Sequence, residues 1–424
     1  MLPNIRGLDA DYLVDSTRVH RRLFVDPDIF DMEMDAIFNN TWVYVAYEGE
    51  VREPGDFVTG YIGRQPVIVV RDQEGSVQVL MNRCMHRAAT VCSEERGNTS
   101  RFTCPYHGWA FKCDGSLFAV PRRQGYGEDL NFQELSLAKP PRIGIYRGFI
   151  FASLNAEVPP LEEHLGNAKK HLDWFADVSI GLYDIEPPQR IAARCNWKLV
   201  ADNVVDGYHL PYTHASTMEL GVITLTEGGG ETRDLGGGHA SLKIMTAEDS
   251  DVDAYIANAG SAYVSALEQE IGAARMKLAF KDNLEGPYVR IFPNLLLLRD
   301  QIRVIYPQAV DRTVFSLRFM YPRGISPEEH SRRKSDRNKK WVGHGGFNTP
   351  DDGEVFARVQ DGLKVEAAEW YLIHRGLDRQ RVDPSGEVVG DREDEQGQRS
   401  LYKHWKRLMK KTLENDAVND PRVS

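Results

Sequence analysis

Short strand-like runs dominate the chain from residue 42 to residue 154. They lie at 42–47, 56–62, 66–71 and 77–82, and turn-forming residues such as Asp72 and Gly75 separate them. The same pattern continues through 110–112 and 145–154, and consecutive prolines at 159–160 mark its end. This pattern predicts an all-β domain.

Helical and strand-like periodicities mix after residue 160. Apolar positions recur at helical spacing in the segments 161–176, 196–208, 261–274, 355–363 and 399–413. Strand-like runs alternate with them at 183–193, 239–246, 288–292, 295–298, 302–308 and 313–321. This mixture predicts an α+β domain with a largely antiparallel sheet. We expect three parts: a mostly helical segment at 1–40 that packs on the α+β domain, the all-β domain at 41–157, and the α+β domain at 158–424.

Composition narrows the class of protein. The formal net charge of −10 over 424 residues argues against a nucleic-acid binder, which normally carries a basic stripe. The five cysteines are irregularly spaced, so a disulfide scaffold is not expected and a reducing compartment fits. The start of the chain lacks the apolar core of a signal peptide, and no apolar run approaches the ~20 residues needed to span a bilayer. We therefore expect a cytoplasmic protein.

Two cysteine–histidine pairs lie within the predicted all-β domain. Cys84 and His86 are spaced as C-x-H, and Cys104 and His107 as C-x-x-H. In a Rieske [2Fe–2S] cluster two cysteines bind one iron and two histidines bind the other. Structural zinc uses the same residue types, but it usually takes both cysteines from one short motif and both histidines from another. The mixed pairs therefore favour the Rieske cluster, and zinc is the alternative.

A second group of candidate metal ligands follows the segment 196–208. Asp206 and His209 are three residues apart, which places them on one face if the helix continues. Pro211 is expected to end the helix and to bias Leu210 toward an extended conformation. His214 then folds back toward His209. Two imidazoles and one carboxylate with open positions form the facial triad of non-haem Fe(II) oxygenases, although an isolated histidine pair is often structural.

The motifs together resemble the α subunits of Rieske non-haem iron aromatic-ring-hydroxylating oxygenases. The resemblance rests on CMHR at 84–87, CPYHGW at 104–109, the segment Asn203–His214 with its D-x-Y-H-x-x-x-x-H pattern, and the D-D-G-E stretch at 351–354. It implies a Rieske [2Fe–2S] domain and a catalytic domain of the helix-grip type. Within this pattern Cys84, His86, Cys104 and His107 bind the cluster.

The resemblance also assigns the second metal. His209, His214 and Asp352 would bind a mononuclear Fe(II), with Asp351 as the fallback for Asp352; a simple helix N-terminus at these acids is the structural alternative. Asp206 would link His209 to the Rieske ligand His107. Asn203 fills the place of an asparagine that precedes this aspartate in the family.

The implied function is that of a terminal oxygenase that hydroxylates an aromatic ring, by dioxygenation or monohydroxylation. It would receive electrons from a ferredoxin and/or an NAD(P)H-dependent reductase, and form a homotrimer of α subunits with, we expect, a small β subunit. A Rieske electron carrier without catalysis is the alternative class, although such a carrier needs little beyond one domain of ~100 residues.

The candidates for binding the substrate are four residues: Asn203, Leu220, Ile223 and Arg303. Arg303 lies on the strand predicted at 302–308, where its guanidinium can hold a carboxylate in a bidentate way. The alternative is that Arg303 pairs with an acidic neighbour or faces the subunit interface. Leu220 and Ile223 are candidate pocket walls. An aromatic carboxylic acid is the preferred substrate, and a neutral arene is the alternative.

Overall fold

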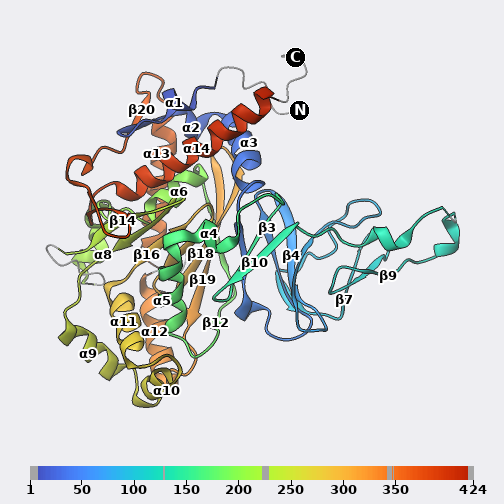
Figure 1. The fold of residues 1–424 in the computed structure, drawn as a ribbon, viewed down its shortest axis with the longest axis horizontal. Coiled ribbons are helices and arrows are strands. Elements are labelled where there is room, and N and C mark those ends of the chain that lie inside the picture. The colour runs from blue at the N-terminus through green and yellow to red at the C-terminus, as the bar shows by residue number, and fades with distance from the viewer. Residues whose placement is uncertain (1–7, 128, 222–228, 341–345, 347, 419–424) are drawn as a thin grey trace. The chain divides into compact units, whose positions relative to one another are not determined.

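The computed structural model describes residues 8–127, 129–221, 229–340, 346 and 348–418 (Figure 1). The chain divides into two compact units. The smaller unit comprises residues 38–161, and the larger unit comprises the residues before 38 together with those from 162 onward. No helix within the described ranges is long and apolar enough to cross a membrane.

The smaller unit consists of antiparallel sheets. Their strand orders are β5-β4-β3-β6, β7-β8-β9 and β10-β11-β2. The strands are β2 (Val43–Tyr47), β3 (Asp56–Ile62), β4 (Gln65–Arg71), β5 (Val77–Met81), β6 (Arg96–Asn98), β7 (Arg101–Thr103), β8 (Ala110–Lys112), β9 (Leu117–Ala119), β10 (Arg142–Tyr146) and β11 (Phe149–Ser153). The predicted all-β domain is confirmed. The run at 145–154, predicted as one strand, belongs to two strands, because Arg147 and Gly148 take positive φ angles of 50° and 84° and form a tight hairpin turn.

The larger unit is built on one long antiparallel sheet. Its order is β12-β19-β18-β17-β16-β15-β14-β22-β21, and β13 also pairs with β19. These strands are β12 (Asp184–Ile185), β13 (Gln189–Ala193), β14 (Glu231–Gly236), β15 (His239–Lys243), β16 (Tyr288–Ile291), β17 (Leu295–Leu298), β18 (Gln301–Ala309), β19 (Arg312–Tyr321), β21 (Arg381–Val382) and β22 (Val388–Asp391). A separate pair joins β1 (Arg18–His20) to β20 (Trp370–Leu372). The predicted α+β architecture with an antiparallel sheet is confirmed.

Helices accompany this sheet throughout the larger unit. They are α1 (Ala10–Leu13), α2 (Arg22–Val25), α3 (Pro27–Glu33), α4 (Leu161–Leu165, which begins at the unit boundary), α5 (Lys169–Asp177), α6 (Trp197–Asn203), α7 (Leu210–Thr213), α8 (Ala215–Glu219), α9 (Asp249–Asn258), α10 (Ser261–Ile271), α11 (Ala273–Glu285), α12 (Pro327–Lys340), α13 (Asn348–Gly362) and α14 (Gln396–Val418). Helix α6 packs on β18, and α14 packs on β14 and β15 (Figure 1). Arg290 of β16 donates hydrogen bonds to the carbonyls of Ala201 in α6 and Gly397 in α14, so both helices cover the same face.

The predicted helix at 196–208 is wrong in its second half. Helix α6 ends at Asn203, and the carboxylate of Asp206 accepts a hydrogen bond from the backbone N–H of Tyr208 at 2.8 Å. Such a side-chain bond competes with helical hydrogen bonding. The expectation for Pro211 is also wrong, because Pro211 lies in the first turn of α7, where a missing N–H costs nothing.

A buried ion pair holds α6 in place. The Lys198 ammonium lies 2.6 Å from Glu33 Oε1, and both side chains are fully buried. The indole N–H groups of Trp197 and Trp405 also donate to the Glu33 carboxylate, at 2.8 and 2.6 Å. This carboxylate therefore joins α3, α6 and α14.

We expect Lys198→Met to reduce the free energy of unfolding by about 3–5 kcal/mol, because it leaves the Glu33 charge buried without its cation. Denaturant titration of the purified protein measures this change. The double variant Glu33→Gln/Lys198→Met removes both charges and should recover most of the loss. Equal destabilisation of the single and double variants would contradict the role of the uncompensated charge.

Candidate metal centres

Two loops of the same shape carry the cysteine–histidine pairs. The backbone N–H of Cys84 donates to the carbonyl of Ala89, and the N–H of Cys104 donates to that of Trp109, both at 2.8 Å. Ala88 and Gly108 occupy equivalent positions, with φ angles of 63° and 70°. The two loops thus share their backbone hydrogen bonds around the cysteines, although the histidine follows two residues after Cys84 and three residues after Cys104.

The side chains at the loop tips lie close together. The rings of His86 and His107 are 4.6 Å apart between centroids, and the ring of His86 stacks on Trp109. Cys84 and Cys104 are buried, and burial, followed by the neighbouring Cys104 thiol, raises the pKa of Cys84. The four predicted residues are therefore brought to one place.

The environment of His86 fits a metal ligand. Its Nε2 lies 3.4 Å from the hydroxyl of Tyr126, whereas its Nδ1 is buried and has no hydrogen-bond partner within the described residues. Burial, followed by the charge of His107, lowers the pKa of His86, which favours the neutral imidazole that binds metal.

The geometry of the two loops bears on zinc as the alternative. A single tetrahedral zinc ion draws its ligand atoms around one point. Among the described residues, His209, His214 and Asp352 form a group with ligand atoms within 4.8 Å of one another, and the loop residues form no such group. Within the described residues, the tight convergence of ligand atoms on one point therefore lies in the larger unit.

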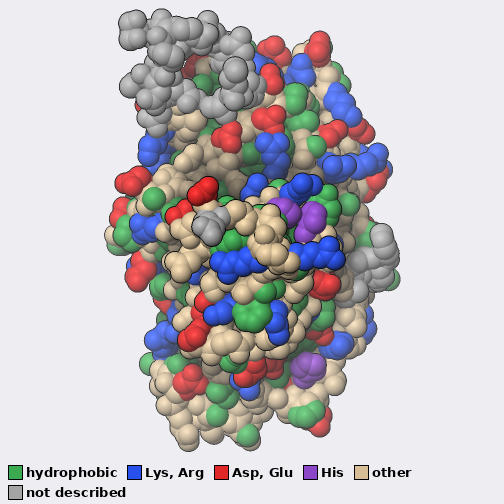
Figure 2. Space-filling model, turned by 90° about the vertical axis from the view of Figure 1, so that its right-hand side faces the viewer, with side chains coloured by type: hydrophobic (Ala, Val, Ile, Leu, Met, Phe, Trp, Pro, Cys, Tyr) green, Lys and Arg blue, Asp and Glu red, His purple; other side chains and the backbone are tan. Residues whose placement is uncertain are grey.

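His107 lies at the surface, unlike the two cysteines. It is exposed, and Figure 2 shows histidine side chains reaching the surface beside Lys and Arg side chains. Arg87 is also exposed and interacts electrostatically with His86. An exposed histidine ligand is where a redox partner can approach a cluster.

A second set of residues comes together in the larger unit. His209 lies at the start of α7, His214 lies between α7 and α8, and Asp352 belongs to α13. The hydroxyl of Thr217 in α8 donates to the side chain of Asn348 in α13 at 3.0 Å, which holds these helices together. The short helices α7 and α8 thus bring His214 beside α13.

The ligand atoms of these three residues converge. Asp352 Oδ1 lies 3.3 Å from His214 Nε2 and 3.7 Å from His209 Nε2. Such separations suit atoms that each lie about 2.1 Å from one shared ion. His214 and Asp352 are buried and His209 is half-buried. Two imidazoles and a carboxylate in this arrangement fit a facial triad.

The electrostatics of the triad favour a cation. Burial lowers the pKa of His209, but the carboxylates of Asp206 and Asp352 outweigh burial and raise it. Burial raises the pKa of Asp352, but His214, His209 and Arg303 outweigh burial and lower it. The negative potential that attracts a proton to His209 also attracts a divalent metal ion.

Each imidazole of the triad has a second carboxylate at its Nδ1. Asp206 Oδ2 lies 3.5 Å from His209 Nδ1, and Asp351 Oδ2 lies 3.4 Å from His214 Nδ1. Carboxylates in such positions orient the ring and fix which nitrogen binds metal. Asp351, considered from the sequence only as a fallback ligand, instead lies behind a histidine. The family pattern indicated Asp352 as the ligand, whereas nothing in the sequence indicated that Asp351 would lie behind His214.

The remaining candidates differ in position. The amide nitrogen of Asn203 lies 3.3 Å from His209 Nε2 and 3.4 Å from Asp352 Oδ1, so Asn203 faces the triad. Arg303 is buried on β18 and interacts electrostatically with Asp352. Leu220 is 64% exposed at the end of α8, and Ile223 lies outside the described residues.

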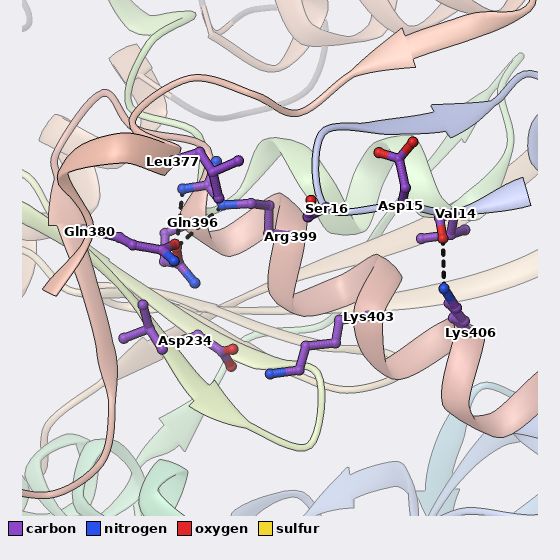
Figure 3. A pocket seen from close by; sticks show the side chains of 11 residues that line it. Val14, Asp15, Ser16, Asp234, Leu377, Gln380, Gln396, Arg399, Lys403 and Lys406 are labelled. Atoms are coloured by element: carbon purple, nitrogen blue, oxygen red, sulfur yellow. Dashed lines mark hydrogen bonds between the residues drawn. The ribbon is translucent and has the colours of Figure 1, made fainter. Parts of the chain in front are cut away.

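A cavity of about 270 Å³ lies beside α14 and shares no residue with the triad (Figure 3). Arg399 lines it but donates to the carbonyls of Ile373 and Arg375, and Lys406 donates to the carbonyl of Val14. Lys403 and Asp234 also line it. Because internal bonds occupy Arg399 and Lys406, the triad is the better candidate for chemistry.

Comparison with known proteins supports this interpretation of both units. Residues 41–136 match the family model described as Rieske [2Fe-2S] domain, and residues 166–411 match that described as ring hydroxylating alpha subunit (catalytic domain). Toluate 1,2-dioxygenase subunit alpha of Pseudomonas putida is 30% identical, over 94% of this chain and 92% of its own. The 2-halobenzoate 1,2-dioxygenase large subunit of Burkholderia cepacia is 32% identical, over 85% of this chain and 80% of its own. The crystal structure of naphthalene 1,2-dioxygenase from Rhodococcus sp. bound to indole superposes with a TM-score of 0.82 at 28% identity, over 92% of this chain and 94% of that one.

We expect substitutions of Asp351 and of Asp352 to have different effects on iron binding. We expect Asp352→Ala to lose about one iron per chain with an unchanged [2Fe–2S] spectrum, because it removes a metal-binding oxygen. Asp351→Ala should keep the same iron stoichiometry at saturating iron but weaken iron affinity about 10–100-fold, since it removes only the group that orients His214. Metal analysis and iron titration measure both. Full iron in Asp352→Ala together with loss in Asp351→Ala would reverse the assignment.

Proposed function

Because the chain belongs to the family of ring-hydroxylating oxygenase α subunits with a Rieske [2Fe–2S] domain, we propose that it is a terminal oxygenase component that hydroxylates the ring of an aromatic carboxylic acid. The family sets the reaction class and the two cofactors. The substrate, the site residues and the assembly are proposals that rest on the contacts described above.

We assign the metal ligands by geometry. Cys84, His86, Cys104 and His107 hold the [2Fe–2S] cluster, and His209, His214 and Asp352 hold the mononuclear iron. When bound, that iron supplies oxygen activation, with electrons that arrive through the cluster. The protein contributes the ligand geometry and the orienting carboxylates.

Asp206 is the residue proposed to connect the two centres. Its Oδ2 faces His209 Nδ1, and the residue is partly exposed. A carboxylate at the surface can accept a hydrogen bond from a second imidazole, and the exposed His107 of another chain provides one. We propose that the electron path runs between subunits of a homotrimer, with a small β subunit as a further component. A ferredoxin and/or an NAD(P)H-dependent reductase would supply the electrons.

The observation that carries the substrate assignment is the position of Arg303. This guanidinium is buried on β18, and its charge acts on Asp352 of the triad. A buried guanidinium is well suited to bind a carboxylate by paired hydrogen bonds. A carboxylate bound there would bring its aromatic ring beside the triad.

The names of two relatives agree with this choice. Toluate and 2-halobenzoate, the substrates named for those proteins, are aromatic carboxylates. Naphthalene, named for the structural neighbour, carries no charge, so a neutral arene is the competing outcome. The purified oxygenase, supplied with a reductase and ferredoxin, should be screened for products from benzoate-type acids and from arenes of similar size.

We expect Arg303→Gln to lower kcat/KM for an aromatic acid about 30-fold or more, because a buried carboxylate would lose its charged partner. This factor corresponds to a loss of about 2 kcal/mol of stabilisation. Turnover of a neutral arene should change little. Product formation with both substrates measures the ratio. The iron content must equal that of the wild type, because Arg303 also acts on Asp352.

Arg318→Gln is the matched control for that experiment. Arg318 of β19 is also buried, but it pairs with Ile302, whereas Arg303 of β18 pairs with Leu317. The two arginine side chains therefore lie on opposite faces of the sheet. It donates to the hydroxyl of Ser316 at 2.7 Å. Equal losses in both variants, or equal losses for acid and arene, would contradict binding of the carboxylate by Arg303.

We expect Asp206→Asn to keep both metals and a reducible cluster but to form almost no product, because the carboxylate that joins the two imidazoles is lost. Reduction of the cluster by the donor and its reoxidation in a single turnover are measured by absorbance. The control is Asp351→Asn, which changes the other orienting carboxylate and should transfer electrons once it is loaded with iron. Normal turnover in Asp206→Asn, or a fully active monomer, would overturn the proposed electron path.

A further inference from the structure

Asp202 is a buried carboxyl group in α6, one turn before Asp206. It is 4% exposed. The hydroxyl of Tyr371 in β20 donates to its Oδ2 at 3.0 Å, and the hydroxyl of Tyr402 in α14 donates to the same oxygen at 2.8 Å. Oδ1 is buried and has no hydrogen-bond partner within the described residues. Both phenols thus donate to the same oxygen, and the other oxygen is buried without a donor from the described residues.

The charged groups around Asp202 do not neutralise it. Arg290 of β16 faces it, but the guanidinium donates to the carbonyls of Gly238, Ala201 and Gly397 instead. Asp206 approaches from the turn after α6, where its N–H donates to the carbonyl of Asn203 at 3.1 Å. Asp202 therefore faces one cation, two phenols and a second carboxylate.

An ionised Asp202 is disfavoured by this environment. A buried charge without an ion pair loses its hydration, and two nearby carboxylates resist simultaneous ionisation. Burial raises the pKa of Asp202 to about 7; Arg290 and the two hydroxyls oppose the rise, and Asp206 adds to it. Of the two acids, Asp206 is the more exposed and lies beside His209.

We propose that Asp202 is a positioning residue that holds a proton on Oδ1 and so leaves Asp206 to carry the negative charge beside His209. This inference rests on the proposed role of Asp206 in the electron path. If an electron reached an iron held by His209, His214 and Asp352, the added negative charge would strengthen proton binding at Asp202. In each chain whose Asp202 is ionised, this carboxylate would then take one proton from solvent and form one O–H bond, and no other bond would change.

The proton on Asp202 can be observed directly. Infrared difference spectra of the oxidised holoenzyme, taken between pH 5 and pH 9, should show a protonated carboxyl band that disappears near pH 7. Asp202→Asn should lack this band. The matched control is Asp282→Asn in α11, because burial also raises the pKa of Asp282 to about 7, so this variant should lose a different band. A spectrum of Asp202→Asn that retains every wild-type carboxyl band would overturn the proposal.

The link to electron transfer needs a second measurement. In a single turnover the rate of cluster reoxidation should fall severalfold in the wild type as the pH rises above about 7, because ionised Asp202 repels the incoming electron. Asp202→Asn should stay fast over this range, and Asp282→Asn should follow the wild type. Identical pH profiles for the wild type and Asp202→Asn would overturn the coupling.

Tyr402→Phe keeps the test decisive if Asp202→Asn does not fold. It removes one donor to the ionised carboxylate, so the infrared midpoint and the pH at which electron transfer slows should both move upward together. Unmoved midpoints would contradict the proposal. The infrared titration requires neither substrate nor product, so failure of the proposed substrate or of the Asp206 electron path would leave its result intact and would be recognised separately.

Discussion

The catalytic unit depends on the position of helix α6, and the buried Glu33 carboxylate fixes that position. Glu33 accepts from Lys198, Trp197 and Trp405, and all of these side chains are removed from water. A buried carboxylate with several charged and neutral donors tolerates little displacement, since each lost donor exposes an uncompensated charge.

The start of α6 is fixed as well, because the N–H of Asn196 donates to the side chain of Gln360 at 2.8 Å. Gln360 belongs to α13, the helix that carries Asp352. The first turn of α6 and the helix with the acidic ligand are therefore positioned together, and the end of α6 delivers Asp202, Asn203 and Asp206 to the site.

The site itself repeats one arrangement twice. Each imidazole of the triad faces Asp352 with Nε2 and a second acid with Nδ1, which is Asp206 for His209 and Asp351 for His214. The Nδ1 contacts assign Nε2 as the metal-binding nitrogen in both rings. The two outer acids are partly exposed, whereas Asp352 is buried. The negative charge of the three carboxylates is thus concentrated around the proposed metal position. It reaches the surface at Asp206, which follows the end of α6.

Local patterns in the sequence were enough to predict much of this arrangement, and the failures have physical causes. Strands β3, β8 and β17 occupy the predicted residues because turn-forming residues bound them on both sides. The pairs Cys84–His86 and Cys104–His107 are brought together as expected, because each lies on a tight loop that its own backbone closes. The end of α6 was missed because the Asp206 side chain replaces helical hydrogen bonds, which apolar periodicity does not reveal. The division of labour between Asp351 and Asp352 depends on how α13 meets α7 and α8, and the proximity of Arg303 to Asp352 depends on packing between distant segments.

The charge of Arg303 links substrate selection to the metal position. Arg303 and Asp352 attract one another inside the protein, so the guanidinium withdraws part of the negative potential that the triad offers to a cation. Under the proposed function, a neutral ligand would leave this positive charge in place, whereas a carboxylate would pair with it. An aromatic carboxylate bound there would return the full negative potential of Asp352 to the proposed metal position. Selection of an acid would then follow from the electrostatic balance of the proposed site as well as from paired hydrogen bonds.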